Sequence, residues 1–177
     1  TPAHTKENWY KLETGLKLYC VHYGESALSD LPQLFMQKVC YKNFTVTCKC
    51  RLNLVNDGDE VGLTVFGKEY SYICAVKDGG RTYLEIRKGF LGEKKDVTLC
   101  RSLPYDKDYV TFKITASYEE RHCLVIKYMF CGRAFKQKFY AVPGKWIGAK
   151  VGIYARANGN SDGFGTFKYF RVDASRL

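Results

Sequence analysis

The sequence contains no long hydrophobic run, although 46% of its 177 residues are hydrophobic. The apolar residues come in short runs, and none approaches the length that a bilayer-spanning helix requires. No signal-peptide pattern opens the chain, and its first residue is Thr1 rather than Met. We therefore expect no membrane partner, and we expect either a processed chain or an excised domain.

Sequence motifs for metals and nucleotides are also missing. There is no C-x-x-C, and the three histidines, His4, His22 and His122, lie far apart, so a zinc site is not expected. The chain has no phosphate-binding loop, no G-x-G-x-x-G after a strand and no nucleophile elbow. These absences indicate that the chain carries no self-contained catalytic apparatus.

The cysteines do not follow a disulfide framework, although their number, 8, is even. They are Cys20, Cys40, Cys48, Cys50, Cys74, Cys100, Cys123 and Cys131. Most lie in apolar strand patterns, where a free cysteine behaves as a small hydrophobic residue. Cys48 and Cys50 lie two apart and face the same way on one strand, so they cannot easily pair. The pattern favours reduced core thiols and a cytoplasmic or anaerobic setting, with secretion as the alternative.

The net charge of +10 leaves several partners open: nucleic acid, an acidic polysaccharide or an acidic protein. The basic residues are scattered, and only Lys94-Lys95 and the Lys136/Lys138 pair come close to a cluster. This scatter favours a lysine-rich soluble surface, and no nucleic-acid partner is expected.

Short alternating segments separated by Gly, Asp and Asn turns run through the chain. The strands are expected at 9–12, 15–22, 34–41, 44–54, 59–66, 70–77, 81–87, 96–100, 109–117, 122–131, 134–139, 150–157 and 165–173. No helix is convincing. The sequence therefore predicts an all-β fold, a two-sheet antiparallel β-sandwich or jelly roll, as one domain over residues 1–177.

The central stretch, residues 59–87, predicts a three-stranded meander. Tyr83 and Glu85 share one face of its last strand, and Leu84 and Ile86 share the other, which is typical of a half-buried strand. Gly79 and its neighbours can supply the positive φ of a tight hairpin.

Asp57, Asp59 and Glu60 form an acidic cluster in this region. A turn rich in Asp and Gly accounts for these residues. Two alternatives stay open: a carboxylate pair for glycoside hydrolysis, and oxygen ligands for a structural calcium ion, with Asp173 as a further candidate. No other cofactor is expected.

Trp146 lies in the segment Gly144-Lys145-Trp146-Ile147-Gly148, where the glycines leave it little local cover. Aromatic rings stack on the apolar faces of sugars, bases and peptides. The alternative is that Trp146 folds back and caps the edge of the sandwich.

Three stretches, in order, resemble the C-terminal β-sandwich of glycoside hydrolase family 43 (GH43) enzymes, mainly β-xylosidases. They are LPQLFMQ at 31–37, GDEVGLTVF at 58–66, and GKWIGAKVGIYA at 144–155 followed by GTFKYF at 165–170. Together they span most of the chain. Two positions depart from the family pattern: Lys168 stands where the family often has Asp, and Trp146 where it has Phe.

The resemblance implies a concanavalin A-like jelly roll that packs on a catalytic β-propeller domain and binds xylan or xylo-oligosaccharide. It also implies that Trp146 helps to close a xylose-binding pocket, with Lys145, Tyr154 and Gln37 as further carbohydrate-binding or pocket-closing candidates. Lys168 weakens a polar or calcium-binding role at its own position, and the larger ring of Trp146 alters the fit of the pocket.

Three functions are therefore in competition. The resemblance favours an accessory module of a xylosidase or arabinofuranosidase, which is not an enzyme by itself. A free-standing lectin-like binder would need an exposed aromatic face. A catalytic sandwich hydrolase would need Asp59 or Glu60 in a groove with a second acid about 5–9 Å away.

Overall fold

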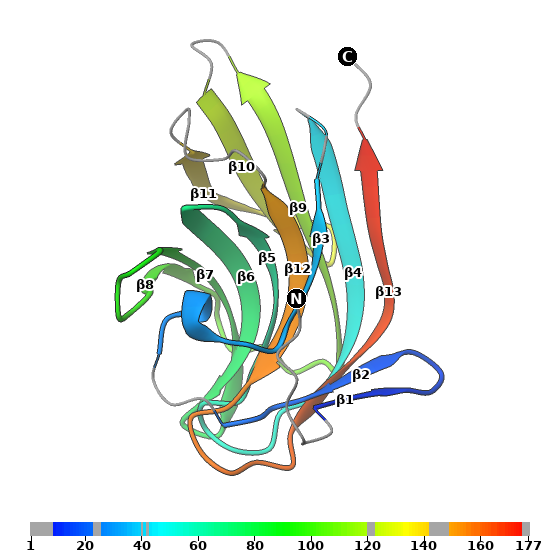
Figure 1. Cartoon of the computed structure of the whole chain (residues 1–177). Helices are drawn as coiled ribbons and strands as arrows, with labels where there is room; N and C mark the ends of the chain where they lie inside the picture. The colour runs from blue at the N-terminus through cyan, green and yellow to red at the C-terminus, as the bar shows by residue number, and fades with distance from the viewer. Residues whose placement is uncertain are drawn as a thin grey trace.

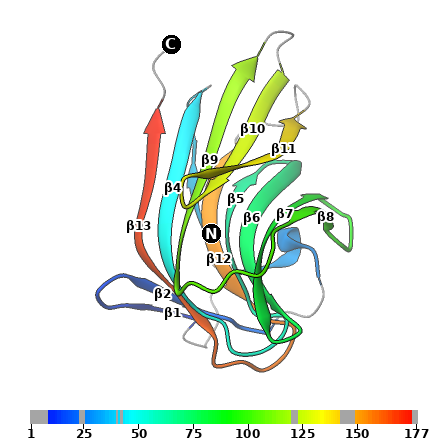
Figure 2. The same cartoon turned by 180° about the vertical axis from the view of Figure 1, so that it is seen from behind.

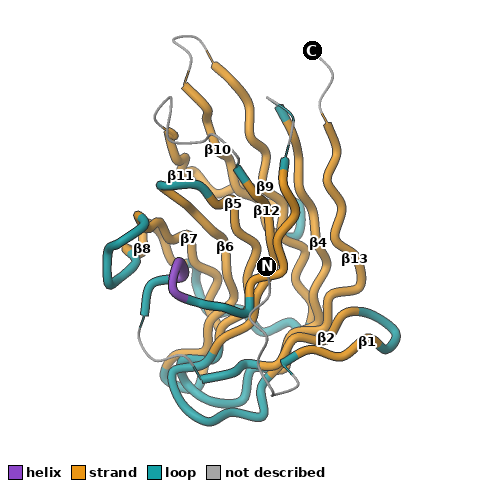
Figure 3. The backbone as a smooth tube through the Cα atoms, in the orientation of Figure 1, coloured by secondary structure: helices purple, strands orange, loops and turns teal. Residues whose placement is uncertain are grey.

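The computed structural model describes residues 9–22, 26–39, 41, 43–119, 123–141 and 149–174. Within these residues the chain consists of antiparallel strands and one short 3₁₀ helix, η1 (Leu28–Asp30), as Figures 1 and 3 show. The predicted all-β sandwich is confirmed. None of the described segments is a helix long and apolar enough to span a membrane.

One sheet has seven strands in the order β1-β2-β13-β4-β9-β10-β11. Their bounds are β1 (Tyr10–Leu12), β2 (Leu16–Tyr19), β13 (Phe164–Ala174), β4 (Phe44–Asn53), β9 (Tyr109–Glu119), β10 (Cys123–Phe130) and β11 (Arg133–Ala141). Figure 2 shows the molecule from behind, with this sheet toward the viewer.

The other sheet has six strands in the order β3-β12-β5-β6-β7-β8. Their bounds are β3 (Leu34–Lys38), β12 (Lys150–Arg156), β5 (Glu60–Phe66), β6 (Glu69–Asp78), β7 (Arg81–Phe90) and β8 (Val97–Arg101). The predicted central meander is β5-β6-β7. Gly79 and Gly80 form its second turn with φ of 55° and 73°, the positive values that a two-residue hairpin loop favours.

Alternating side chains of both sheets fill the space between them. In β4 the inward residues Phe44, Val46, Cys48 and Cys50 are buried, as the sequence pattern predicts. They pack with the inward residues of β5, which include Val61, Leu63 and Val65, in one continuous hydrophobic core. Removing such side chains from water is the main term that stabilises a sandwich of this size.

The outer face of the six-stranded sheet is covered as well. A second cluster joins Leu28, Leu31 and Leu34 to the outward residues Tyr70, Tyr72, Cys74 and Tyr154 of that sheet. In Figure 1, η1 lies against this face. The prediction that β7 is half-buried is therefore wrong at Glu85: it faces outward, yet its exposed fraction is 0%.

The described cysteines are free thiols, and most of them are buried. Cys20, Cys48, Cys50 and Cys74 lie in the interior, whereas Cys131 is exposed. Burial raises the pKa of the Cys48 thiol, which favours the neutral form. Cys40 and the side chain of Cys123 lie outside the described residues.

Candidate functional site

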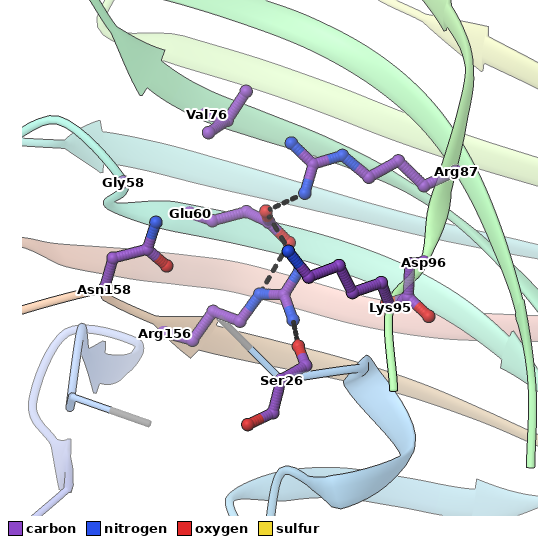
Figure 4. Close-up of a pocket in the computed structure, with 9 residues that line it drawn as sticks. All are labelled: Ser26, Gly58, Glu60, Val76, Arg87, Lys95, Asp96, Arg156 and Asn158. Carbon is purple, nitrogen blue, oxygen red and sulfur yellow. Dashed lines mark hydrogen bonds and ion pairs between the residues drawn. The ribbon is translucent and has the colours of Figure 1, made fainter. Parts of the chain in front are cut away.

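A polar cavity of about 160 Å³ lies on the outer face of the six-stranded sheet (Figure 4). Its lining residues come from β5, β6, β7, β12 and neighbouring loops: Ser26, Gly58, Glu60, Val76, Arg87, Lys95, Asp96, Arg156 and Asn158. The register brings them together, because Glu60 of β5 lies opposite Arg156 of β12 on one side and Val76 of β6 on the other.

Glu60 is the centre of this cavity wall. Both of its oxygens accept from Arg156, whose Nε lies 3.1 Å from Oε1 and whose Nη2 lies 3.2 Å from Oε2. Arg87 donates to Oε2 through Nη1 at 2.8 Å, and the Tyr154 hydroxyl donates to Oε1. The carboxylate is 2% exposed, so this charge is buried with two cations and one hydroxyl donor.

The charges around Glu60 determine its protonation. Burial raises the pKa of Glu60, but Arg156 and Arg87, together with the Tyr154 hydrogen bond, outweigh that effect and hold the pKa below its ordinary value. Burial alone would lower the pKa of Arg156. The negative charge of Glu60 outweighs burial and raises the pKa well above its ordinary value. Glu60 is therefore an anion and Arg156 a cation across the physiological pH range.

The ion pairs continue along the sheet. Arg87 Nε donates to Glu85 at 2.6 Å, and Arg101 Nε donates to the other oxygen of Glu85 at 2.5 Å. Arg101 also pairs with Asp78 at 2.7 Å. These contacts link β7 to the edge strand β8 and neutralise the buried Glu85.

Residues 26–31, which include η1, form what we call the covering segment, and Asp96 holds this segment onto the tyrosines of β6. It accepts from the hydroxyls of Tyr70 and Tyr72 at 2.6 and 2.7 Å. The backbone N–H of Leu28 donates to the same carboxylate at 2.8 Å. Arg156 adds a bond to the carbonyl of Ser26 at 3.0 Å, so two charged side chains of the cavity fix this segment.

The arrangement suits recognition better than proton transfer. A glycosidase acid needs a raised pKa, whereas that of Glu60 is lowered. Asp59 and Glu60 are adjacent but both are buried, and Asp59 has an exposed fraction of 0%. Asp59 Oδ2 accepts three hydrogen bonds, from the N–H groups of Val55 and Asn56 and from the Ser161 hydroxyl. The predicted turn is present at residues 56–58, where the Asp59 N–H donates to the Asn56 carbonyl at 3.0 Å, but the Asp59 and Glu60 side chains beside it are buried.

The three calcium candidates occupy different surroundings. Asp57 accepts from the N–H of Gly80, and Asp173 pairs with Arg171 on the surface. Asp173 lies opposite Thr45 near the start of β4, while Asp57 and Asp59 follow its end, roughly 25 Å away at about 3.3 Å per residue. One ion cannot be shared by all three.

The orphan oxygen of Asp59 is the feature closest to a cation ligand. Asp59 Oδ1 is buried and has no hydrogen-bond partner among the described residues. Calcium takes six to eight oxygens, and the described part of the chain holds no group of three or more His, Cys, Asp or Glu side chains that could bind a metal. A calcium ion at Asp57 or Asp59 stays a prediction.

The carbohydrate-binding candidates fall in three places. Lys145 and Trp146 lie outside the described residues. Gln37 is exposed on the edge strand β3, opposite Val151. Tyr154 is fully buried, with its hydroxyl on Glu60, so a sugar would reach it only if the cover over this face moved. The structure does not bring Gln37 and Tyr154 to one surface, because they lie at positions of opposite parity on the paired strands β3 and β12.

The sequence reasoning found Glu60 but missed its partners Arg87 and Arg156. It also missed Asp96, which lines the same cavity. A signal was present. Arg156 ends the apolar run of β12, and Glu60 directly precedes that of β5. A charge embedded in such a strand end indicates a buried ion pair.

A family profile described as the β-xylosidase C-terminal concanavalin A-like domain matches residues 2–173. No curated protein matches the sequence significantly. Among solved structures, a bifunctional GH43-CE protein of Bacteroides eggerthii has a TM-score of 0.76 at 14% identity, over 96% of this chain and 22% of that one. A xylan β-1,4-xylosidase of Bacillus halodurans has a TM-score of 0.71 at 15% identity, over 93% and 34%. An alginate lyase of Pseudomonas aeruginosa has a TM-score of 0.62 at 11% identity, over 97% and 88%.

These structural likenesses show the fold, and this chain spans only 22% and 34% of the two GH43-related chains. The family profile, in contrast, covers nearly the whole sequence. The chain belongs to the family of β-xylosidase C-terminal concanavalin A-like domains.

Proposed function

We propose that this chain is a non-catalytic accessory module of a GH43 enzyme of the xylosidase or arabinofuranosidase type. It packs against a catalytic β-propeller domain and contributes to the binding of xylan-type sugars. The observation that carries this proposal is the pairing of Glu60 with Arg87 and Arg156 in the cavity of a domain of this family.

The charge pairing supports a non-catalytic role. Glu60, Glu85 and Asp96 are the acids of the outer-face network, and each is held by two or more donors. A carboxylate with such partners is a poor general acid, because taking up the proton that it would have to donate costs the ion pairs as well. The hydrolytic carboxylates would then belong to the catalytic domain.

The cavity can contribute hydrogen bonds to sugar hydroxyls. Arg87 has a side chain that is 18% exposed, and the neighbouring Lys95 and Asn158 are exposed at the cavity rim. Ammonium, guanidinium and amide groups all donate to hydroxyl oxygens. The position of Arg87 is fixed by its ion pairs with Glu60 and Glu85, which lowers the entropic cost of binding.

Trp146 would supply the apolar wall of the sugar site. Its ring would cover one face of a xylose unit and exclude water from the neighbouring catalytic domain, which strengthens the electrostatic interactions there. This role rests on the sequence of the Gly144–Gly148 segment and on the family.

The proposal is tested in an enzyme assembled from this chain and a GH43 catalytic domain, with a chromogenic β-xyloside as substrate. The Trp146→Ala variant should raise KM several-fold, because about 1 kcal/mol of stacking free energy with the sugar is lost. The Leu12→Ala variant, which changes a side chain that is 74% exposed on β1, should leave KM unchanged. Equal kinetics of the Trp146→Ala variant and the wild type would contradict the proposal.

A further inference from the structure

The outer face of the seven-stranded sheet carries a broad band of positive charge. Side chains alternate along its strands, so the neighbours of the buried core residues point outward. The outward basic residues define what we call the cationic face: Lys17 of β2, Arg171 of β13, Lys49 and Arg51 of β4, Lys113 of β9, Lys127 of β10 and Lys138 of β11.

The register makes these residues one surface. Arg51 of β4 lies opposite Thr166 of β13, which in turn lies opposite Lys17 of β2. On the other side, Thr47 of β4 lies opposite Lys113 of β9. Adjacent strands are about 4.8 Å apart and alternate residues of one strand are about 6.6 Å apart. The cations therefore form an extended array, which suits a polymer better than a small anion.

Little negative charge offsets the array. Among the outward side chains that the structure describes on these strands, Asp173 is the one carboxylate, and it pairs with Arg171 at 2.7 Å. The outer face of the six-stranded sheet is different, because Glu60 and Glu85 pair with its arginines. Among the described side chains, cations therefore outnumber carboxylates on the outer face of the seven-stranded sheet.

Aromatic rings lie between the cations, and cations cover three of them, whereas Tyr169 and Tyr140 are 44% and 57% exposed. Lys17 Nζ lies 3.8 Å from the ring centre of Phe164 and 4.8 Å from that of Tyr19. Tyr109 lies beneath both Lys49 and Arg51, at 5.5 and 5.8 Å. Single-stranded nucleic acids bind by stacking bases on open rings, and rings covered in this way are poor platforms for it.

Hydroxyl groups fill the positions between the charges. Thr45, Thr47, Thr111, Thr115 and Thr166 point outward from β4, β9 and β13, and all are partly exposed. A threonine hydroxyl both donates and accepts hydrogen bonds, as sugar hydroxyls do. Alternating cations and hydroxyls match a chain of sugars that carries carboxylates.

We propose that the cationic face binds a linear acidic polysaccharide, namely a xylan that bears uronate side groups. Lys49, Arg51 and Lys113 pair with its carboxylates, and the threonines bond to its hydroxyls. That the ligand is a carbohydrate rests on the proposed function. The face itself is separate from the cavity around Glu60, because the two lie on different sheets.

Affinity electrophoresis and calorimetry with glucuronoxylan test the proposal, and the same polymer after reduction of its carboxyl groups is the matched ligand. The native polymer should bind at least about tenfold more tightly than the reduced one, and raising NaCl from 50 to 500 mM should remove most of this difference by screening. Equal affinity for both polymers would overturn the acidic-ligand proposal, while binding of neutral xylo-oligosaccharides would still support the proposed function. Binding of neither polymer would overturn both.

Charge-matched variants locate the site. The Lys49→Gln/Arg51→Gln/Lys113→Gln variant should lose about tenfold or more in affinity for glucuronoxylan. The Lys68→Gln/Arg81→Gln/Lys94→Gln variant removes the same charge from exposed residues along the six-stranded sheet and should bind as the wild type does. Circular dichroism of both variants verifies folding. Equal losses in both variants, or tighter binding of single-stranded poly(dT) than of glucuronoxylan at 150 mM NaCl, would overturn the assignment.

Discussion

At the scale of single residues, Glu60 carries the largest electrostatic consequence. Moving a carboxylate out of water costs several kcal/mol, and the ion pairs with Arg87 and Arg156 offset that cost only while all partners are present. A buried pair of this kind adds little net stability over an apolar substitute. Removing only one partner is costly, because the other charge then stays buried without its counter-ion.

The Glu60→Gln variant should therefore lose about 3 kcal/mol of unfolding free energy, because Arg156 stays buried without its carboxylate. Urea unfolding at pH 7 measures the loss. The Glu93→Gln variant, at an exposed position in the β7–β8 turn, should lie within about 0.5 kcal/mol of the wild type. A loss below about 1 kcal/mol at Glu60 would show that the network contributes little.

The same residue predicts a pH dependence. The folded state lowers the pKa of Glu60, so its contribution is present above the unfolded value of about 4.3 and is lost as the pH falls through the folded value. The stability difference between the wild type and Glu60→Gln should be constant from pH 6 to 8 and should shrink below about pH 4. Unfolding curves at a series of pH values measure it. A difference that grows in acid would contradict the sign of the pKa shift.

Single buried residues were predictable where the alternation was regular. The inward positions of Cys48 and Cys50 follow from period two, since one face of β4 is apolar and the other polar. Burial of Glu60 and Glu85 was not predictable in this way. Glu60 meets Arg87 and Arg156, which lie 27 and 96 residues away along the chain, and no local pattern shows that these charges will meet. Glu85 has a closer partner, Arg87, two residues along the same strand, but its burial depends on Arg101 of β8 as well.

At the scale of elements, the segment that contains η1 explains the burial of a second sheet face. Leu28 has no exposed surface, and it packs with Tyr70 and Tyr72 of β6 on the face opposite the main core. Backbone bonds from Leu28 to Asp96 and from Ser29 to Tyr70 hold the segment in place. The cavity around Glu60 depends on this cover, because Ser26 forms part of its wall.

Removing the anchor of this segment should destabilise the chain. The Leu28→Ala variant should lose about 2–4 kcal/mol of unfolding free energy and should speed hydrogen exchange in β6. The Leu103→Ala variant, in which the original side chain is 86% exposed, should change stability by less than about 0.5 kcal/mol. Thermal unfolding with exchange mass spectrometry measures both. Equal behaviour of the two variants would mean that the segment is not part of the core.

The strands themselves were predictable to within a few residues, and the covering segment was not. Each strand follows from alternation between turn residues, and the β6–β7 turn follows from Gly79 and Gly80. Residues 24–32 contain turn formers throughout, so the sequence predicted a loop. Only the tyrosines of β6, which face away from the main core, required that something apolar cover them.

At the scale of the whole molecule, the two outer faces divide the charge. The six-stranded sheet holds a neutralised network beneath a covering segment, and the seven-stranded sheet holds the cationic face. A positive surface raises the local concentration of an acidic polymer and speeds its association. This division fits a module that keeps an enzyme near its substrate while the chemistry takes place in another domain.

The central claim is that this domain binds xylan-type sugars, and the most direct measurement is a titration of the chain with xylohexaose, followed by tryptophan fluorescence and heat. The chain has 2 tryptophans, and Trp9 is only 4% exposed, so a change on binding reports mainly on Trp146. The account predicts saturable binding that is lost in the Trp146→Ala variant. No binding by the wild type at millimolar sugar, where even about 4 kcal/mol of binding free energy is detectable, would contradict it.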